Sequence, residues 1–181
     1  EQWHDRIDVN VPSETVKTVP MDVYHRFVWT RLEGATLGSY NWAYFDRLVN
    51  DAIIKKQKMS FGIMTVFPDG TTDAGLAAYD GGYSAYPLYL HNLMKAEAVK
   101  DWKSGSTWVP NYNSNNYLNR LLALNQALYN HILATTYNGK RYRDVISIID
   151  IRGYGSWGEW HSAGTVDEVS QYPAGTFPTV A

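Results

Sequence analysis

The chain has 181 residues, 45% of them hydrophobic and 19% charged, which is enough apolar material for one domain with a sizeable core and argues against a disordered chain. Its formal charge of -2, with 16 Lys and Arg scattered among 18 Asp and Glu, leaves no basic stripe for phosphates. Cys is absent, and no apolar run approaches the roughly 20 residues of a membrane-spanning helix. We therefore expect one domain over residues 1–181, with no nucleic-acid partner and no transmembrane segment.

The first half of the chain shows two strands and a helix. Residues 1–22 lack sustained periodicity and contain two prolines, so they are expected to form an irregular lead-in. The run VYHRFVW at 23–29 is mostly apolar on both faces, which is typical of a buried parallel strand. Apolar residues then recur at helical spacing from Trp42 to Ile53, and MSFGIMTVF at 59–67 is a second expected strand.

The second half begins with a stretch of weak periodicity. Residues 68–113 are rich in Gly, Pro, Tyr, Asn and Asp and are predicted to be a long functional loop with a short helix near 87–100. A clean apolar stripe predicts a helix that is capped by Ser114 or Asn113, extends to about Tyr137 and is ended by an Asn-Gly pair. DVISIIDI at 144–151 is the clearest strand of the chain.

Strands separated by helices predict an α/β fold with a parallel sheet, here of the (β/α)8 TIM-barrel type. Function in such folds gathers at the carboxyl ends of the strands, and the segment GYGSWGEWH at 153–161 directly follows the last predicted strand. Only three or four strands are expected, and the final PAGTFPTVA resembles the lead into another helix. We therefore expect this chain to hold only the first half of a barrel.

Glu159 is the leading candidate for catalysis. A carboxyl group just beyond a barrel strand, between Trp157 and Trp160, could be partly desolvated and have a raised pKa suited to a general acid. The alternative is that Glu159 only pairs with an arginine or with a backbone group near the strand end. Replacing Glu159 would distinguish these hypotheses.

Charged residues inside the strands are candidates for substrate contact. Asp150 and Arg152 alternate with isoleucines, so both side chains are expected on one face at the top of the barrel. A buried ion pair between them is an equally good interpretation. Arg26 lies within the first strand and is expected to orient the catalytic acids.

The aromatic composition suggests that the protein binds sugar. The chain has 14 Tyr and 7 Trp but only 5 Phe, and aromatic rings that carry a polar group are suited to partly hydrated clefts. The predicted substrate-binding residues are Arg26, Trp29, Asp150, Arg152, Tyr154, Trp157, Trp160 and His161. Rings of the long loop could also stack on sugars, namely Tyr79, Tyr83, Tyr86, Tyr89, Trp102, Trp108 and Tyr112. No second His lies at metal-ligand spacing from His161, so neither a metal nor another cofactor is expected.

RFVWTRLEG, the helical YNWAYFDRLVNDAIIKK and the strand MSFGIMT resemble a stretch of family 42 β-galactosidases and related clan A glycoside hydrolases. WVPNY and DIRGYGSWGEWH resemble β-galactosidase-like barrel proteins of polysaccharide-degrading bacteria. The resemblance implies that Glu159 is the acid/base after the fourth barrel strand and that Arg26 supports a nucleophilic Glu after the seventh. Two positions differ, because Gly158 replaces the usual Asn before the acid/base and Gly34 replaces a Pro.

The resemblance implies a glycoside hydrolase acting on oligo- or polysaccharide, located in the periplasm, at the cell surface or outside the cell, with its export signal already removed. The partner carboxylate is expected beyond Ala181, so this chain alone is expected to be inactive. One alternative is a non-catalytic carbohydrate-binding protein on a degenerate barrel, and another is an interaction domain. The sequence does not determine the sugar, the linkage or the oligomeric state.

Overall fold

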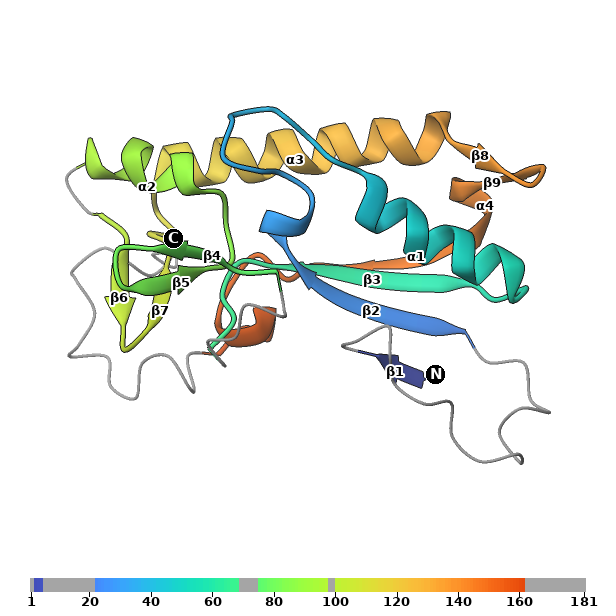
Figure 1. Ribbon diagram of the computed structural model, residues 1–181, viewed down its shortest axis with the longest axis horizontal. Coiled ribbons are helices and arrows are strands. Elements are labelled where there is room, and N and C mark those ends of the chain that lie inside the picture. Colours follow the sequence, from blue (N-terminus) through green and yellow to red (C-terminus); the bar gives the residue numbers. More distant parts are fainter. Residues whose placement is uncertain (1, 5–21, 69–74, 98–99, 162–181) are drawn as a thin grey trace.

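The computed structural model describes residues 2–4, 22–68, 75–97 and 100–161. Its central element is a parallel sheet whose strands follow one another in the order β1-β2-β3-β10 (Figure 1). These strands are β1 (Gln2–His4), β2 (Val23–Val28), β3 (Met59–Met64) and β10 (Ile146–Asp150). The strands predicted at 23–29 and 59–67 are confirmed, whereas most of the predicted lead-in lies outside the described residues.

The register of the sheet places two predicted site residues and a glycine in one row across three strands. Arg26 pairs with Gly62, and Gly62 pairs with Asp150. Side chains in one row of a parallel sheet point to the same face. Arg26 and Asp150 therefore share a face, with a glycine between them.

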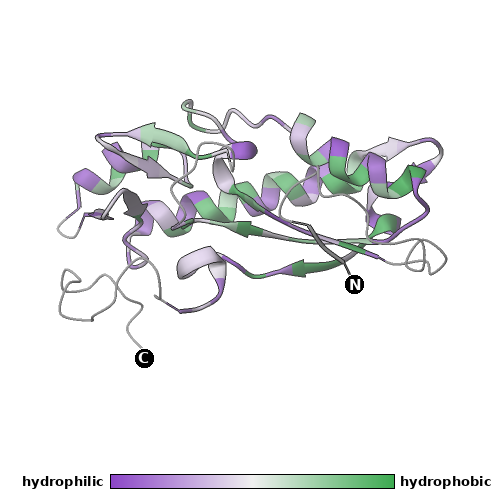
Figure 2. Cartoon of the chain, turned by 60° about the horizontal axis from the view of Figure 1, so that its bottom comes forward, coloured by the Kyte–Doolittle hydropathy of each residue, from purple (hydrophilic) through white to green (hydrophobic). Residues whose placement is uncertain are grey.

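Two helices cover the opposite face of this sheet (Figure 1). The helix α1 (Ala43–Ile54) connects β2 to β3, and α3 (Asn115–Ala134) lies in the connection from β3 to β10. Phe27 and Phe61 of the sheet stack at 5.8 Å and contact Phe45 of α1 edge-on. Figure 2 shows hydrophobic residues along the strands and along the helix faces that pack on them. The core therefore lies between the sheet and these two helices.

The long region after β3 is more regular than predicted. It contains the expected short helix, α2 (Leu88–Lys95), and a separate sheet of order β4-β5-β7-β6. Its strands are β4 (Ala77–Tyr79), β5 (Gly82–Ser84), β6 (Trp102–Ser104) and β7 (Thr107–Val109). The turn between β4 and β5 has Asp80 and Gly81 at φ 40° and 68°. An Asp-Gly pair is a strong hairpin signal, so this hairpin was recognisable in the sequence.

The Ser114 cap of α3 is confirmed, because its side chain accepts a hydrogen bond from the Tyr117 amide. The helix ends at Ala134, before the predicted Asn-Gly stop, because that pair instead turns a hairpin with φ 48° and 74°. The remaining elements are β8 (Thr136–Tyr137), β9 (Lys140–Arg141), α4 (Tyr142–Val145) and the single-turn helices η2 (Trp29–Arg31) and η4 (Ser156–Gly158).

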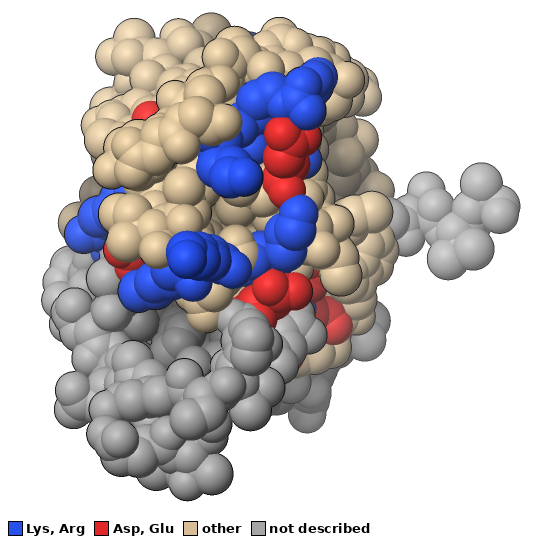
Figure 3. All heavy atoms as spheres, turned by 90° about the vertical axis from the view of Figure 1, so that its right-hand side faces the viewer, with Lys and Arg blue, Asp and Glu red and all other residues tan. Residues whose placement is uncertain are grey.

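The end of the molecule at which β2, β3 and β10 begin is covered with mixed charges (Figure 3). Lys55 pairs with Asp51 at 2.8 Å, and Arg141 pairs with Asp144 at 2.7 Å. These side chains are half exposed, so the pairs stabilise the fold only slightly. The candidate site lies at the other end of the strands.

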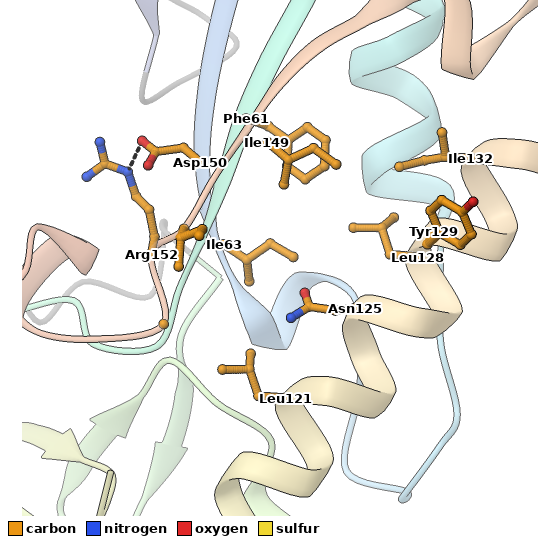
Figure 4. Close-up of a pocket in the computed structure, with 12 residues that line it drawn as sticks. Phe61, Ile63, Leu121, Asn125, Leu128, Tyr129, Ile132, Ile149, Asp150 and Arg152 are labelled. Carbon is orange, nitrogen blue, oxygen red and sulfur yellow. Dashed lines mark hydrogen bonds and ion pairs between the residues drawn. The ribbon is translucent and has the colours of Figure 1, made fainter. Parts of the chain in front are cut away.

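One edge of the central sheet is apolar and open. β10 is its last strand among the described residues, and Ile149 and Ile151 are 57% and 73% exposed. A groove of about 200 Å³ separates β10 from α3. Figure 4 shows Ile149, Phe61 and Ile63 facing Leu128 and Ile132 across it, with Asp150 and Arg152 pointing to the other side of the strand.

The α/β prediction is confirmed, although the described strands do not close into a barrel. No helix within the described ranges is long and apolar enough to cross a membrane.

Candidate functional site

The predicted loop GYGSWGEWH is held firmly above the carboxyl ends of β3 and β10. The Trp157 amide donates to the Val66 carbonyl at 3.1 Å, just beyond β3. The Gly155 amide donates to the Tyr112 hydroxyl at 3.0 Å, and the Ser156 amide donates to the His161 carbonyl at 2.8 Å. These bonds close the loop on itself and fasten it to the sheet.

The loop backbone adopts conformations that most residues avoid. Trp157 and Trp160 have φ of 51° and 59°, although neither is a glycine. Left-handed backbone in a bulky residue costs on the order of 1–2 kcal/mol, and such residues concentrate at functional sites. The strain supports the choice of this loop as the candidate site.

Glu159 extends from the end of η4 into a cluster of basic side chains. Arg26 Nη1 of β2 donates to its Oε1, Arg152 Nη1 lies 3.6 Å from the same oxygen, and His161 Nε2 lies 3.2 Å from Oε2. The Arg26 side chain is 8% exposed and that of Glu159 is 37% exposed. The structure thus brings together a carboxylate, two guanidinium groups and an imidazole from β2 and from the segment after β10.

The surroundings of Glu159 favour its ionised form. Burial alone would raise the pKa of this carboxyl, but the Arg26 and His161 hydrogen bonds and the charges of Arg26 and Arg152 hold the pKa below its usual value. The prediction of a raised pKa is therefore wrong for this structure. The sequence placed two tryptophans beside Glu159 but did not show that two arginines would reach it.

The lowered pKa of Glu159 predicts a specific pH dependence of stability. The contribution of the ionised carboxylate is fully present above the ordinary glutamate pKa and is lost as pH falls through the lowered value. Solvent screening keeps the expected loss below about 1 kcal/mol, because the side chain is more than one-third exposed. Urea unfolding of the wild type and of Glu159→Gln across pH 2 to 7 measures this loss of stability. The urea midpoints of the two proteins are expected to converge at low pH, and a difference that stays constant with pH would contradict the prediction.

A second polar cluster lies beside the first. The Tyr24 hydroxyl of β2 donates to Asp150 Oδ2 at 2.7 Å, and Arg152 Nε donates to both the Tyr24 hydroxyl and Asp150 Oδ2 at 2.7 Å. Burial and the hydrogen bond to Asp150 raise the pKa of Tyr24 to about 12, so this phenol stays protonated at neutral pH. Asp150 and Arg152 thus form the ion pair that sequence reasoning gave as one of two interpretations.

The aromatic residues of the loop form two ring pairs. Trp160 is 63% exposed, and its indole N–H donates to the Ile151 carbonyl at 2.9 Å. The Tyr154 ring lies 5.6 Å from that of Trp160, and the Trp157 ring lies 6.0 Å from the His161 ring. An exposed indole held by a hydrogen bond is a suitable surface for the apolar face of a sugar.

Trp29 does not join the other predicted site residues. It is fully buried in the core, where its indole N–H donates to Glu33 Oε2 at 2.8 Å. The buried Glu33 carboxylate also accepts from the Gly38 amide at 2.7 Å and the Tyr89 hydroxyl at 2.8 Å, and lies 3.3 Å from Arg120 Nη2. Sequence reasoning missed this network, although the Trp and the Glu stand four residues apart in RFVWTRLEG.

Several aromatic residues of the long region also serve the core rather than a binding surface. Tyr86, Trp108 and Tyr112 are buried. Tyr86 donates to Asp101 at 2.8 Å, and the same carboxylate contacts the fully buried His91. Tyr86 and Trp108 therefore pack around the second sheet and α2, whereas Tyr112 holds the loop at Gly155.

Within the ranges that the structure describes, no three His, Asp or Glu side chains gather as a metal site would require. No protein-family model matches the chain, and comparison with curated proteins gives no match. The assignment of function therefore rests on the geometry of the loop and of the two charge clusters.

Proposed function

We propose that the chain forms the first half of a (β/α)8 barrel. Three observations support this: the parallel strands are neighbours in chain order, α1 and α3 cover the same face of the sheet, and the β10 edge is apolar and open. In a barrel the next strand would pair with β10, and a further helix would fill the groove beside α3. An open doubly wound sheet would instead carry helices on both faces.

We infer that the protein acts on oligo- or polysaccharide as a glycoside hydrolase resembling family 42 β-galactosidases. The observation that supports this most is the Glu159 carboxylate at the carboxyl end of β10, which pairs with Arg26 and belongs to a loop that also exposes Trp160. Glu159 would serve as general acid and base, and a carboxylate from later barrel strands would attack or activate water. Trp157, Tyr154 and Trp160 would hold the sugar. A location in the periplasm, at the cell surface or outside the cell agrees with a polysaccharide substrate.

The ionised state of Glu159 favours a second candidate function, a carbohydrate-binding protein without hydrolysis. A general acid must carry a proton when the substrate binds, and two arginines oppose that protonation here. Carboxylates and guanidinium groups beside an aromatic ring can bind sugar hydroxyls without any proton transfer. A second carboxylate roughly 5 to 10 Å from Glu159 would favour the hydrolase, because a like charge raises the pKa of a carboxyl group.

A binding experiment tests what both functions share. We expect calorimetric titration with a panel of oligosaccharides to detect binding to this chain, and Trp160→Ala to weaken that binding about tenfold through loss of ring stacking. Tyr129→Ala provides a matched control, because Tyr129 is an exposed aromatic residue that belongs to α3 and not to the loop. Absence of binding to every glycan, or equal effects of the two variants, would reject the carbohydrate proposal.

A further inference from the structure

The side chain of Arg152 crosses the sheet instead of extending into open space. Arg152 follows β10, yet its Nε reaches the Tyr24 hydroxyl on β2, two strands away. Between them lies β3, whose residue in the row of Arg26 and Asp150 is Gly62. The aliphatic stem of Arg152 therefore passes directly over Gly62.

Gly62 leaves room for this stem. A methyl group at Gly62 would lie 2.8 Å from both Cγ and Cδ of Arg152, which is closer than non-bonded carbon atoms approach one another. A methyl group at Gly158 would instead lie 2.5 Å from Arg152 Cβ and 2.7 Å from the Arg152 carbonyl oxygen, and Gly158 has φ of 68°, so this second glycine is explained by its own turn and by the Arg152 backbone. The space over Gly62 is what admits the stem; we call it the arginine slot, and Arg152 fills it.

From the arginine slot, Arg152 links three parts of the site. Its Nε bonds Tyr24 and Asp150, while its Nη1 donates to the Trp157 carbonyl at 3.3 Å. The same Nη1 lies 3.6 Å from Glu159 Oε1. The Arg152 side chain is 13% exposed, which leaves little of it for contact with a ligand.

We propose that Arg152 is a positioning residue that fixes the Glu159 loop onto the sheet, and that Gly62 is a glycine because it forms the slot for the Arg152 stem. The expectation that Arg152 affects sugar binding rests on the proposed function. The existence of the arginine slot does not depend on that function. This role differs from the substrate contact that the sequence suggested for Arg152.

Gly62→Ala provides a sharp test, because alanine is ordinarily the better residue inside a strand. Without the slot, the substitution would leave the urea midpoint unchanged or raise it. With the slot, we expect the unfolding equilibrium constant to rise about tenfold, from crowding against Arg152. Gly34→Ala is the matched control, because nothing lies within 4 Å of a methyl group there and its φ is not positive. We expect little change in that variant.

A double-mutant cycle assigns the effect to Arg152. In an Arg152→Ala background, Gly62→Ala is expected to cause no loss of stability, because the crowded atoms are gone. An equal loss in both backgrounds would overturn the proposal. If Arg152→Ala does not fold, the urea midpoints of Gly62→Ala and Gly34→Ala decide alone, and equal midpoints reject the slot.

The pKa of Glu159 is a second quantity to measure, because a general loss of stability would not change it in the folded protein. Carbon-13 NMR titration of folded Gly62→Ala is expected to show the pKa of Glu159 moving up toward its usual value, as Arg152 is displaced. An unchanged pKa would contradict the positioning role. Oligosaccharide binding by the same variant is a separate experiment. The stability and pKa measurements can therefore confirm the slot even if no glycan binds to the wild-type chain.

Discussion

Glu159→Gln is expected to lower the turnover of aryl glycosides about 100- to 10,000-fold in a protein in which this chain is continued by the rest of the barrel. Glutamine keeps the size of the side chain and a hydrogen-bond acceptor for Arg26, but it cannot deliver or accept the proton. The acid/base step would then depend on water alone. Steady-state kinetics with an aryl glycoside and with an oligosaccharide measures the loss.

The matched control for Glu159→Gln is Asp51→Asn, which removes an exposed carboxylate of α1 that pairs only at the surface with Lys55. We expect the control to keep wild-type turnover. Unchanged turnover in Glu159→Gln would reject the acid/base role. A wild-type protein that binds glycans tightly but hydrolyses none of them would instead favour the carbohydrate-binding alternative.

Glu33→Ala is expected to lower the free energy of unfolding by about 3–5 kcal/mol. Glu33 is fully buried, and its carboxylate accepts hydrogen bonds from Trp29, Gly38 and Tyr89 and pairs with Arg120. Removing it leaves the buried Trp29 indole N–H and the partly buried Tyr89 hydroxyl without this acceptor, and it leaves the Arg120 guanidinium without its carboxylate partner. Urea unfolding of the chain at neutral pH measures the difference.

Asp51→Ala serves as the control for this second prediction, because it also removes a carboxylate paired with a cation. The Asp51 and Lys55 side chains are 50% and 58% exposed, so a change of at most about 0.5 kcal/mol is expected. A loss in Glu33→Ala no larger than in the control would mean that solvent reaches and satisfies the buried donors.

The strands and long helices of the fold were predictable because their signals are local. β2 and β3 are mostly apolar on both faces, and α3 carries a stripe with a capping Ser114, so short windows of sequence were sufficient. The second sheet was not predicted, because its strands are only three residues long and alternate too briefly to show a period. The Asp80-Gly81 turn was the one clear local sign of it.

The candidate site was predictable in position but not in chemistry. That the GYGSWGEWH loop follows a parallel strand could be read from the order of the elements. The ionisation of Glu159 could not, because its pKa depends on Arg26, which is 133 positions away in the chain. Trp29 and Trp160 illustrate the same limit: both are tryptophans near strand ends, yet one is buried and the other is 63% exposed, and only tertiary packing distinguishes them.

The open edge of β10 has a consequence for biosynthesis if the barrel proposal is correct. Strands leave the ribosome in chain order, so this half of the sheet can form before any strand pairs with the outer edge of β10. During that time Ile149 and Ile151 remain exposed. An uncovered apolar edge is a template for any extended chain, including another copy of the same protein. The interval before the next strand arrives is therefore the stage at which a chaperone would protect this protein most, and at which crowded expression would lead to aggregation.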